Sequence, residues 1–322
     1  MSGPIVTVTL NPAIDQTLVV EQLRVGERNR VTDLRTDPGG KGINVSRALK
    51  ELGVDSIATG FAPGSVGHFI ERELVGAGIR LDFVNTGGET RTNVTLVDSK
   101  HHVTTTIHNA GPDLDPGRLD ELGERLRQHL APGGWLVLGG SLPPSLDANV
   151  YAELIRVAQA GEVHTAVDTE GEPLRAAVGA NPELVRMSPA SLAELMDAEL
   201  EEEKDCFASM VELHEAGVGT VLVTPRDGPS LAVNADGRWR VTPPTVPTAT
   251  LISEVGWTDA TLAGVIDVLY RGGEFEAALR RGIAAGRAAM VTPGTQLCEA
   301  STVAAFEEQV RIEHLDAADP AG

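Results

Sequence analysis

The stretch DPGGKGIN, residues 37–44, decides how this chain is interpreted, because a glycine-rich turn here runs directly into a predicted helix at 43–52. Gly39 and Gly40 let the backbone approach a ligand closely, and a helix N-terminus offers free N–H groups to an anion. Lys41 adds a positive charge, and Asn44 can hydrogen-bond to hydroxyl groups. The turn is not a Walker loop, since Gly42 follows Lys41 where Ser or Thr is required. The spacing alone also fits an ordinary glycine-rich turn.

The first predicted strand provides a second polar group. Residues 5–10, IVTVTL, are apolar and β-branched, and Asn11-Pro12 ends them. Asp15 follows, and ligands of parallel α/β sheets bind beyond the carboxyl ends of the strands. A carboxylate here suits two sugar hydroxyls. Taken alone, however, Asp after a strand favours a simple turn.

Strand and helix patterns alternate along most of the chain. This alternation predicts an α/β fold in which helices flank a mostly parallel central sheet on both faces. The predicted helices lie at about 43–52, 66–77, 116–130, 147–160, 189–197, 203–216, 259–271 and 274–290, and further strands at 135–138, 163–167 and 220–223.

Two regions, 16–36 and 91–107, alternate apolar and polar residues only in part, which is typical of strands with one wet face. We expect them to pair into a small β-sheet that stands off the main body. A hairpin pattern at 234–237 predicts antiparallel strands late in the chain. We therefore expect a single domain over 1–314, followed by a disordered tail at 315–322.

Composition excludes several classes of function. With 42% hydrophobic and 22% charged residues, the 322-residue chain can bury a large core, and it has no apolar run long enough to cross a membrane. The N-terminus lacks the basic residues of a signal peptide, which predicts a cytoplasmic protein. The net charge of −20 disfavours nucleic acid as a partner. Cys206 and Cys298 have no short metal or redox spacing, so no protein-held metal is predicted.

Several motifs together resemble one family. They are TLNPAID at 9–15, DPGGKGINV at 37–45, ETRTNV at 89–94, GSLPP at 140–144, Asp168-Thr169 with Gly171, and TPGT at 292–295. The chain resembles the PfkB, or ribokinase-like, carbohydrate kinases over about residues 5–310. Within that family it is most similar to the 1-phosphofructokinase and tagatose-6-phosphate kinase branch.

The resemblance implies a ribokinase-like sheet with a β lid that closes over a sugar phosphate. It implies that Asp15, Gly39, Gly40 and Asn44 hold the sugar hydroxyls, with Ser141 nearby. By analogy, the cations that meet the phosphate already on the substrate are Lys41, Arg28, Arg30 and Arg91. Members of this family often pair through their lids, which makes a homodimer an expectation.

The catalytic element of the family is a Gly-Ala-Gly-Asp turn that opens a helix. Its N–H groups stabilise the phosphoryl group in transfer, and its Asp accepts the hydroxyl proton. Here Gly256 and Asp259 match, but Trp257 replaces the Ala and Thr258 the second Gly. A β-branched Thr resists the φ values of Gly, and the indole can crowd the phosphates. Asp259 also fits a plain helix N-cap.

Two further departures affect the nucleotide side. The family sequence Lys-Pro-Asn-x-x-Glu reads RMSPAS at 186–191, so Ser188 and Ser191 replace the Asn and Glu that help to place magnesium. The family turn Ser-Leu-Gly-x-x-Gly is shortened to TPRDG at 224–228. The residues predicted to contact the nucleotide are Ser188, Thr224, Arg226 and Gly228.

Three interpretations remain open. In the first, ATP and Mg²⁺ serve a working kinase that phosphorylates a ketohexose phosphate such as fructose 1-phosphate, with Asp259 as the base. In the second, the chain is a pseudokinase that binds a sugar phosphate as a sensor or regulator. In the third, a kinase uses another donor such as pyrophosphate or ADP, which no residue specifically supports.

Overall fold

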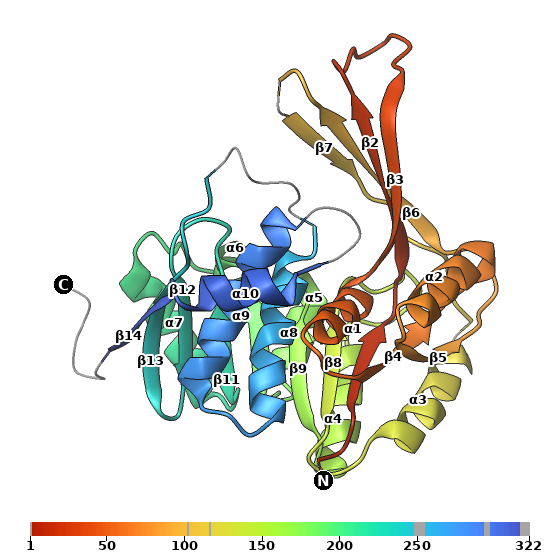
Figure 1. Cartoon of the computed structure of the whole chain (residues 1–322). Helices are drawn as coiled ribbons and strands as arrows, with labels where there is room; N and C mark the ends of the chain where they lie inside the picture. Colours follow the sequence, from red (N-terminus) through yellow and green to blue (C-terminus); the bar gives the residue numbers. More distant parts are fainter. Residues whose placement is uncertain (1, 102, 116, 248–254, 293–296, 316–322) are drawn as a thin grey trace.

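The computed structural model of the chain describes residues 2–101, 103–115, 117–247, 255–292 and 297–315 (Figure 1). A large sheet has the strand order β14-β13-β12-β11-β10-β9-β8-β1-β4-β5, and a separate sheet has the order β3-β2-β6-β7. The large sheet is parallel from β11 to β5, and its remaining pairs are antiparallel. This is the ribokinase-like α/β fold that the sequence predicted.

The strands of the large sheet are β1 (Ile5–Thr9), β4 (Ser56–Phe61), β5 (Arg80–Val84), β8 (Trp135–Gly139), β9 (His164–Asp168), β10 (Leu184–Met187), β11 (Thr220–Val223), β12 (Ser230–Asn234), β13 (Gly237–Thr242) and β14 (Arg311–Leu315). The central strands β1, β4 and β8 are buried along their whole length. Helices cover both of their faces, which explains why the residues of both faces are buried, including polar ones such as Thr7 and Thr59.

The helices are α1 (Lys41–Glu51), α2 (Gly64–Gly76), α3 (Gly117–His129), α4 (Val150–Ala160), α5 (Gly171–Val178), α6 (Pro189–Met196), α7 (Glu203–Glu215), α8 (Trp257–Tyr270), α9 (Phe275–Val291) and α10 (Ala300–Glu307). One apolar core joins the sheet to α1, α8, α9 and α10, and others join it to α3 and α4 or to α6 and α7. No helix in the described ranges is long and apolar enough to span a bilayer.

The second sheet forms a lid that rises from the body (Figure 1). It consists of β2 (Ala13–Val20), β3 (Val31–Gly39), β6 (Arg91–Asp98) and β7 (Val103–Ile107). The predicted pairing of the two wet-faced regions is confirmed, with β2 parallel to β6. Because β2 follows β1 closely and β3 leads into α1, the base of the lid lies at the carboxyl edge of the large sheet.

The predicted elements agree with the structure to within a few residues, but six elements were not predicted: β4, β5, α5, β10, α10 and β14. Two of these elements show why they were missed in the sequence. The strand β10 has only four residues and carries a charged Arg186, and β14 is a largely exposed edge strand without an apolar face. Leu315, assigned to the tail, is the last residue of β14, and residues 316–322 lie outside the described part.

Candidate active site

Polar residues at the carboxyl ends of the parallel strands gather at one edge of the large sheet. Asn11 follows β1 and Ser141 follows β8, while Asp168 ends β9, Ser188 follows β10 and Thr224 follows β11. Carboxyl ends of parallel strands meet at one edge, where ligands of this sheet type bind. The strand order puts β1 and β8 on one side of this edge and β10 and β11 on the other, with β9 between them. We call these the sugar side and the nucleotide side.

Asp15 lies at the base of the lid, on the sugar side. Its Oδ1 accepts a 2.9 Å hydrogen bond from Asn93 Nδ2 of the neighbouring strand β6. A Cβ atom on Gly39 would lie 2.2 Å from Asp15 Oδ2, so only glycine leaves room for this carboxylate. Burial raises the pKa of Asp15, against the lowering effect of the Asn93 hydrogen bond and of the nearby Arg91 charge. The carboxylate is therefore held in a partly dry position where it can accept hydroxyl groups.

Asn44 connects this cradle to the predicted base. It is buried in the first turn of α1, and its Nδ2 donates a 2.8 Å hydrogen bond to Asp259 Oδ2. On the other side, Arg47 Nη1 lies 3.5 Å from Asn44 Oδ1 and donates to the Pro38 carbonyl at 3.1 Å. Arg47 thus favours the amide orientation that turns the Asn44 N–H group towards Asp259.

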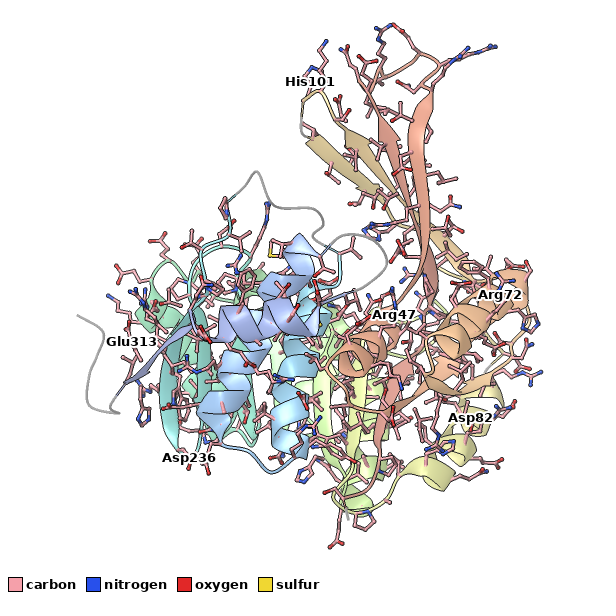
Figure 2. The ribbon with its side chains drawn as sticks, viewed as in Figure 1. Arg47, Arg72, Asp82, His101, Asp236 and Glu313 are labelled. Carbon is pink, nitrogen blue, oxygen red and sulfur yellow. The ribbon has the colours of Figure 1, made fainter. Side chains whose placement is uncertain are left out.

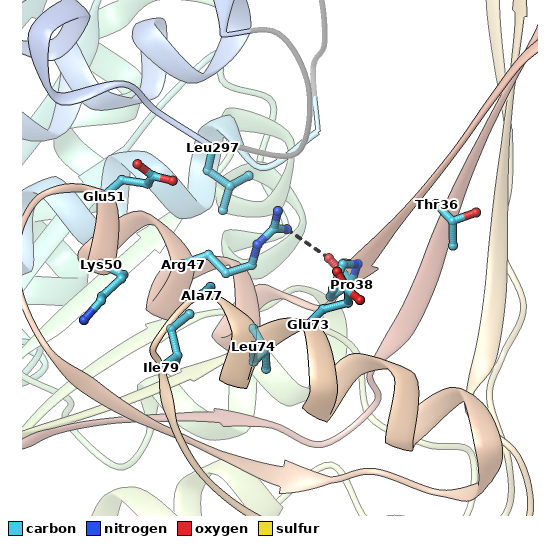
Figure 3. Close-up of a pocket in the computed structure, with 10 residues that line it drawn as sticks. All are labelled: Thr36, Pro38, Arg47, Lys50, Glu51, Glu73, Leu74, Ala77, Ile79 and Leu297. Atoms are coloured by element: carbon cyan, nitrogen blue, oxygen red, sulfur yellow. Dashed lines mark hydrogen bonds between the residues drawn. The ribbon is translucent and has the colours of Figure 1, made fainter.

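Arg47 reaches these groups from the wall of a cavity of about 310 Å³ behind the glycine turn (Figure 3). Burial lowers the pKa of the Arg47 guanidinium, while the carboxylates of Asp37 and Glu51 raise it. Asp15, Asn44 and Asp259 do not line this cavity, whereas Pro38, which precedes Gly39 in the glycine turn, does.

The start of α8 has the geometry of an anion-binding turn. Gly256 is the N-cap with φ 79°, a left-handed conformation that glycine adopts without strain, so this part of the family turn is preserved. Trp257 and Thr258 open the helix in regular helical structure, so their N–H groups are free of helix partners. Asp259 is the third helical residue and is 4% exposed, so it is not the N-cap that the sequence also allowed.

Lys41 lies between the two sides, away from the expected phosphate cluster with Arg91. Its Nζ is 3.3 Å from Asp168 Oδ2, 3.2 Å from Thr258 Oγ1 and 3.5 Å from Asp259 Oδ1. Burial alone would lower the pKa of Lys41, but the carboxylates of Asp168 and Asp259 outweigh it and raise the pKa. The ammonium group is therefore charged at neutral pH and stands beside the predicted base.

Arg91, at the start of β6, is the arginine that the fold brings to the sugar side. It donates to the Asn109 carbonyl at 2.8 Å and to the Asn11 carbonyl at 3.0 Å, and burial lowers its pKa. Its Nε is buried without a partner among the described residues. One donor of the guanidinium is therefore left unsatisfied near Asp15.

Arg28 and Arg30 lie elsewhere. Both are exposed in the connection between β2 and β3, at the outer tip of the lid (Figure 1). At about 3.3 Å per strand residue, the far end of β2 is about 17 Å from Asp15. Within one copy of the chain, the structure does not bring these two arginines to the sugar side.

Ser141 is exposed at the end of β8 and accepts a 3.2 Å hydrogen bond from Asn11 Nδ2. The same amide nitrogen donates to the Ala110 carbonyl at 2.9 Å, which ties the end of β1 to the chain segment after β7. Ser141 thus borders the sugar side, but within the described part of the chain it makes no hydrogen bond to Asp15, Asn44 or Asp259.

On the nucleotide side the predicted polar groups are already paired. Ser188 caps α6 by accepting from the Ser191 N–H at 3.0 Å, and the two hydroxyls lie 2.8 Å apart. Thr224 is buried, and its Oγ1 accepts from Arg186 Nε at 2.7 Å. Arg226 and Gly228 are exposed in the loop after β11. Of the four residues predicted to contact the nucleotide, Arg226 and Gly228 are thus the exposed ones.

The residues present do not fit a magnesium ion held by the protein alone. Mg²⁺ prefers carboxylate and amide oxygens, and the two family positions here are hydroxyls that bond to each other. Asp168, at the end of the adjacent strand β9, is occupied by Lys41 and Arg186. Among the described residues no group of His, Cys, Asp or Glu could hold a metal ion. The start of α8 with Lys41, in contrast, fits a phosphate group.

Four contributors to the site were not singled out from the sequence: Asn11, Asn93, Asp168 and Arg186. Asn11, Asn93 and Asp168 fall within the quoted family motifs, where their polar side chains could have been examined. No sequence pattern identified Arg186 as a buried partner of Asp168, because that contact joins β10 to β9 across the sheet.

The comparisons with known proteins identify the family of this chain. Residues 8–302 match the model of the pfkB family of carbohydrate kinases. The chain is 32% identical to a 1-phosphofructokinase of Rhodobacter capsulatus over 98% of its own length and 99% of the relative. It is also 32% identical to an ATP-dependent 6-phosphofructokinase isozyme 2 of Mycobacterium tuberculosis, over 94% and 89%. The chain therefore belongs to the pfkB family of carbohydrate kinases and is phosphofructokinase-like.

Solved structures support the same assignment. Phosphofructokinase-2 from Escherichia coli, in complex with fructose-6-phosphate, has a TM-score of 0.89 at 28% identity, covering 95% of this chain and 99% of that one. An Arabidopsis thaliana ribokinase complexed with ribose and ATP has a TM-score of 0.75 at 18% identity, covering 96% and 99%, and supports the fold alone.

Proposed function

We propose that this chain is an ATP-dependent kinase that phosphorylates a free hydroxyl of a phosphorylated ketohexose such as fructose 1-phosphate. The supporting observation is the 2.8 Å hydrogen bond from Asn44 Nδ2 to Asp259 Oδ2. It joins the glycine cradle to the only residue of the α8 turn that can accept a proton. The resemblance to 1-phosphofructokinases supports the substrate class.

In this proposal Asp15 and Asn44 hold the sugar hydroxyls, and Arg91 contacts the phosphate that the substrate already carries. Asp259 accepts the proton of the attacking hydroxyl as its oxygen bonds to the γ-phosphorus, while the bond from that phosphorus to the ADP oxygen breaks. The N–H groups at the start of α8 and the Lys41 ammonium stabilise the negative charge on the phosphoryl group in transfer. Neither Trp257 nor Thr258 removes a backbone N–H, so the substitutions preserve this contribution.

A second candidate is a sugar-phosphate-binding pseudokinase. The observation that favours it is the closed Ser188–Ser191 pair, which leaves neither hydroxyl as an obvious ligand for a magnesium–nucleotide complex. A binding protein would need only the sugar side, where Asp15, Asn44 and Arg91 converge.

A coupled assay with fructose 1-phosphate, ATP and magnesium separates the two candidates. We expect Asp259→Asn to lower kcat by about 10²- to 10⁴-fold, as for loss of a general base. Asp236→Asn, in the distant β12–β13 hairpin (Figure 2), is the matched control and should leave kcat unchanged. Equal rates for the wild-type and Asp259→Asn proteins would support the pseudokinase. Fructose 6-phosphate and pyrophosphate, tested in place of the substrate and donor, define the specificity.

We also propose that two copies pair through their lids. Four large apolar side chains of the lid are exposed: Val31 (47%), Leu34 (56%), Val103 (54%) and Ile107 (56%). They lie on β3 and β7, the two edge strands of the lid sheet, where a second copy could cover them. Leu34→Glu should convert a dimer to a monomer in sedimentation velocity, whereas Val75→Glu on α2 should not. A monomeric wild-type protein would refute the pairing.

A further inference from the structure

Arg186 and Trp257, both departures from the family motifs, meet at the nucleotide side. Arg186 lies on β10 where the family has Lys, and Trp257 opens α8 where the family has Ala. The guanidinium carbon of Arg186 is 5.4 Å from the centre of the indole ring, within the range of a cation–π contact. Arg186 is only 4% exposed, so the half-buried indole helps to keep water from the charge.

The edge of the same guanidinium is fixed by other groups. Arg186 Nη1 lies 3.4 Å from both carboxylate oxygens of Asp168, and Nε donates to Thr224 Oγ1 at 2.7 Å. A buried charge is expensive unless its donors and its faces are satisfied. Asp168 and Thr224 accept hydrogen bonds from the edge of the Arg186 guanidinium, and the Trp257 indole covers one of its faces. The positions of these three side chains therefore depend on the position of Arg186.

This arrangement reaches the proposed base through Lys41. Arg186, Asp168, Lys41 and Asp259 form a row of alternating charges, with separations of 3.4, 3.3 and 3.5 Å. Asp168 is therefore shared by two cations, and Lys41 by two carboxylates. If Arg186 withdrew from Asp168, the unshared carboxylate would attract Lys41 more strongly and draw it from Asp259.

We propose that Arg186 and Trp257 are a matched pair of positioning residues that holds Asp168 and, through it, sets Lys41 between Asp168 and Asp259. The catalytic part of this inference rests on the proposed function. The pair replaces the Lys and Ala of the family as a unit. Without the guanidinium the indole would lose its cation–π partner, and without the indole the buried guanidinium would have one face uncovered. Trp257 is thus a component of the site and not an obstruction of it.

The test is a double-mutant cycle of Arg186→Lys, Trp257→Ala and the combined variant, measured in kcat, KM and thermal unfolding. We expect each single change to lower kcat about 10-fold, with KM for the sugar phosphate changed less than about 3-fold. The combined variant, which restores the family pairing, should recover most of the loss. If the loss of kcat in the combined variant equals the product of the two single losses, the inference is wrong.

A matched control cycle uses Arg72 and Phe69 on α2 (Arg72 is labelled in Figure 2). Their guanidinium-to-ring distance, 5.3 Å, is similar, but the Arg72 side chain is 72% exposed and far from the site. Arg72→Lys and Phe69→Ala should show only weak coupling in stability, because their contact is exposed, and should leave kcat unchanged. If the combined Arg72 and Phe69 variant recovered as much as the combined Arg186 and Trp257 variant, this would also count against the inference.

A measurement without turnover separates failure of this inference from failure of the proposed function. Acetylation of the four lysines, Lys41, Lys50, Lys100 and Lys204, can be followed by mass spectrometry in the wild-type and Arg186→Met proteins. We expect Lys41 to react several-fold more slowly in the variant, relative to Lys50, because the unshared Asp168 holds its ammonium more tightly. An unchanged ratio refutes the positioning of Lys41, whether or not the wild-type protein is a kinase.

Discussion

The sugar side and the nucleotide side of this site are built at the same sheet edge but differ in what their polar groups do. On the sugar side, Asp15 Oδ1 accepts a hydrogen bond from Asn93, and Arg91 Nε has no hydrogen-bond partner among the described residues. Polar atoms therefore remain available to a ligand on this side. On the nucleotide side, Ser188 bonds to Ser191, and Thr224 to Arg186. The family motif is thus kept on the side proposed to bind the sugar, and its substitutions on the other side form an internal network.

After that of Asp259, the largest effect should come from Lys41, which joins the two sides. Lys41→Met should lower kcat about 10²- to 10³-fold with a smaller change in KM for the sugar phosphate, because its Nζ lies beside Asp259 and Thr258. Lys50→Met is the control, since Lys50 lies on the same helix and pairs with the exposed Asp55. A large KM increase at unchanged kcat would restore the phosphate-binding role predicted from the sequence.

An intermediate effect should distinguish the arginines of the sugar side. Arg91→Met should raise KM for the sugar phosphate about 10- to 100-fold, as for the loss of a charged hydrogen bond of about 1.5–3 kcal/mol. Arg28→Met should change KM less than about 2-fold, because Arg28 lies at the lid tip. If both variants lose the same affinity, the tip of one lid reaches the site of a second copy.

The smallest effect should appear in stability. Since burial raises the pKa of Asp15 above its ordinary 3.8, this group stabilises the fold below pH 3.8, and that contribution is lost as the pH rises through the folded-state pKa. Asp15→Asn should therefore unfold less readily at pH 7, by on the order of 1 kcal/mol, and lose this advantage near pH 3.8. Urea titrations at the two pH values measure it, with the exposed Asp33→Asn as control. An advantage that is independent of pH would exclude ionisation of Asp15 as its cause.

The sequence predicts the fold well because its strands and helices are locally patterned. The buried strand β8 is continuously apolar, and the glycine turn before α1 needs no distant information. It predicts the sugar side for the same reason: Asp15, Gly39 and Asn44 lie within one short part of the chain. The position of Lys41 could not be predicted, because it depends on Asp168 and Asp259, which are 127 and 218 residues away. Equally, nothing local reveals that Thr224 is occupied by a side chain from the adjacent strand.

The division of the sugar side between two sheets has a mechanical consequence. Asp15 and Asn93 belong to the lid, whereas Asn44 and Asp259 belong to helices on the body (Figure 1). A sugar held by both sets is a removable cross-link between two separately hydrogen-bonded sheets. Separating the lid from the body would then require the bound sugar to lose its contacts with one of the two sets. The protein with bound sugar should therefore unfold at a higher temperature than the empty protein, and the increase should grow with the affinity for the sugar.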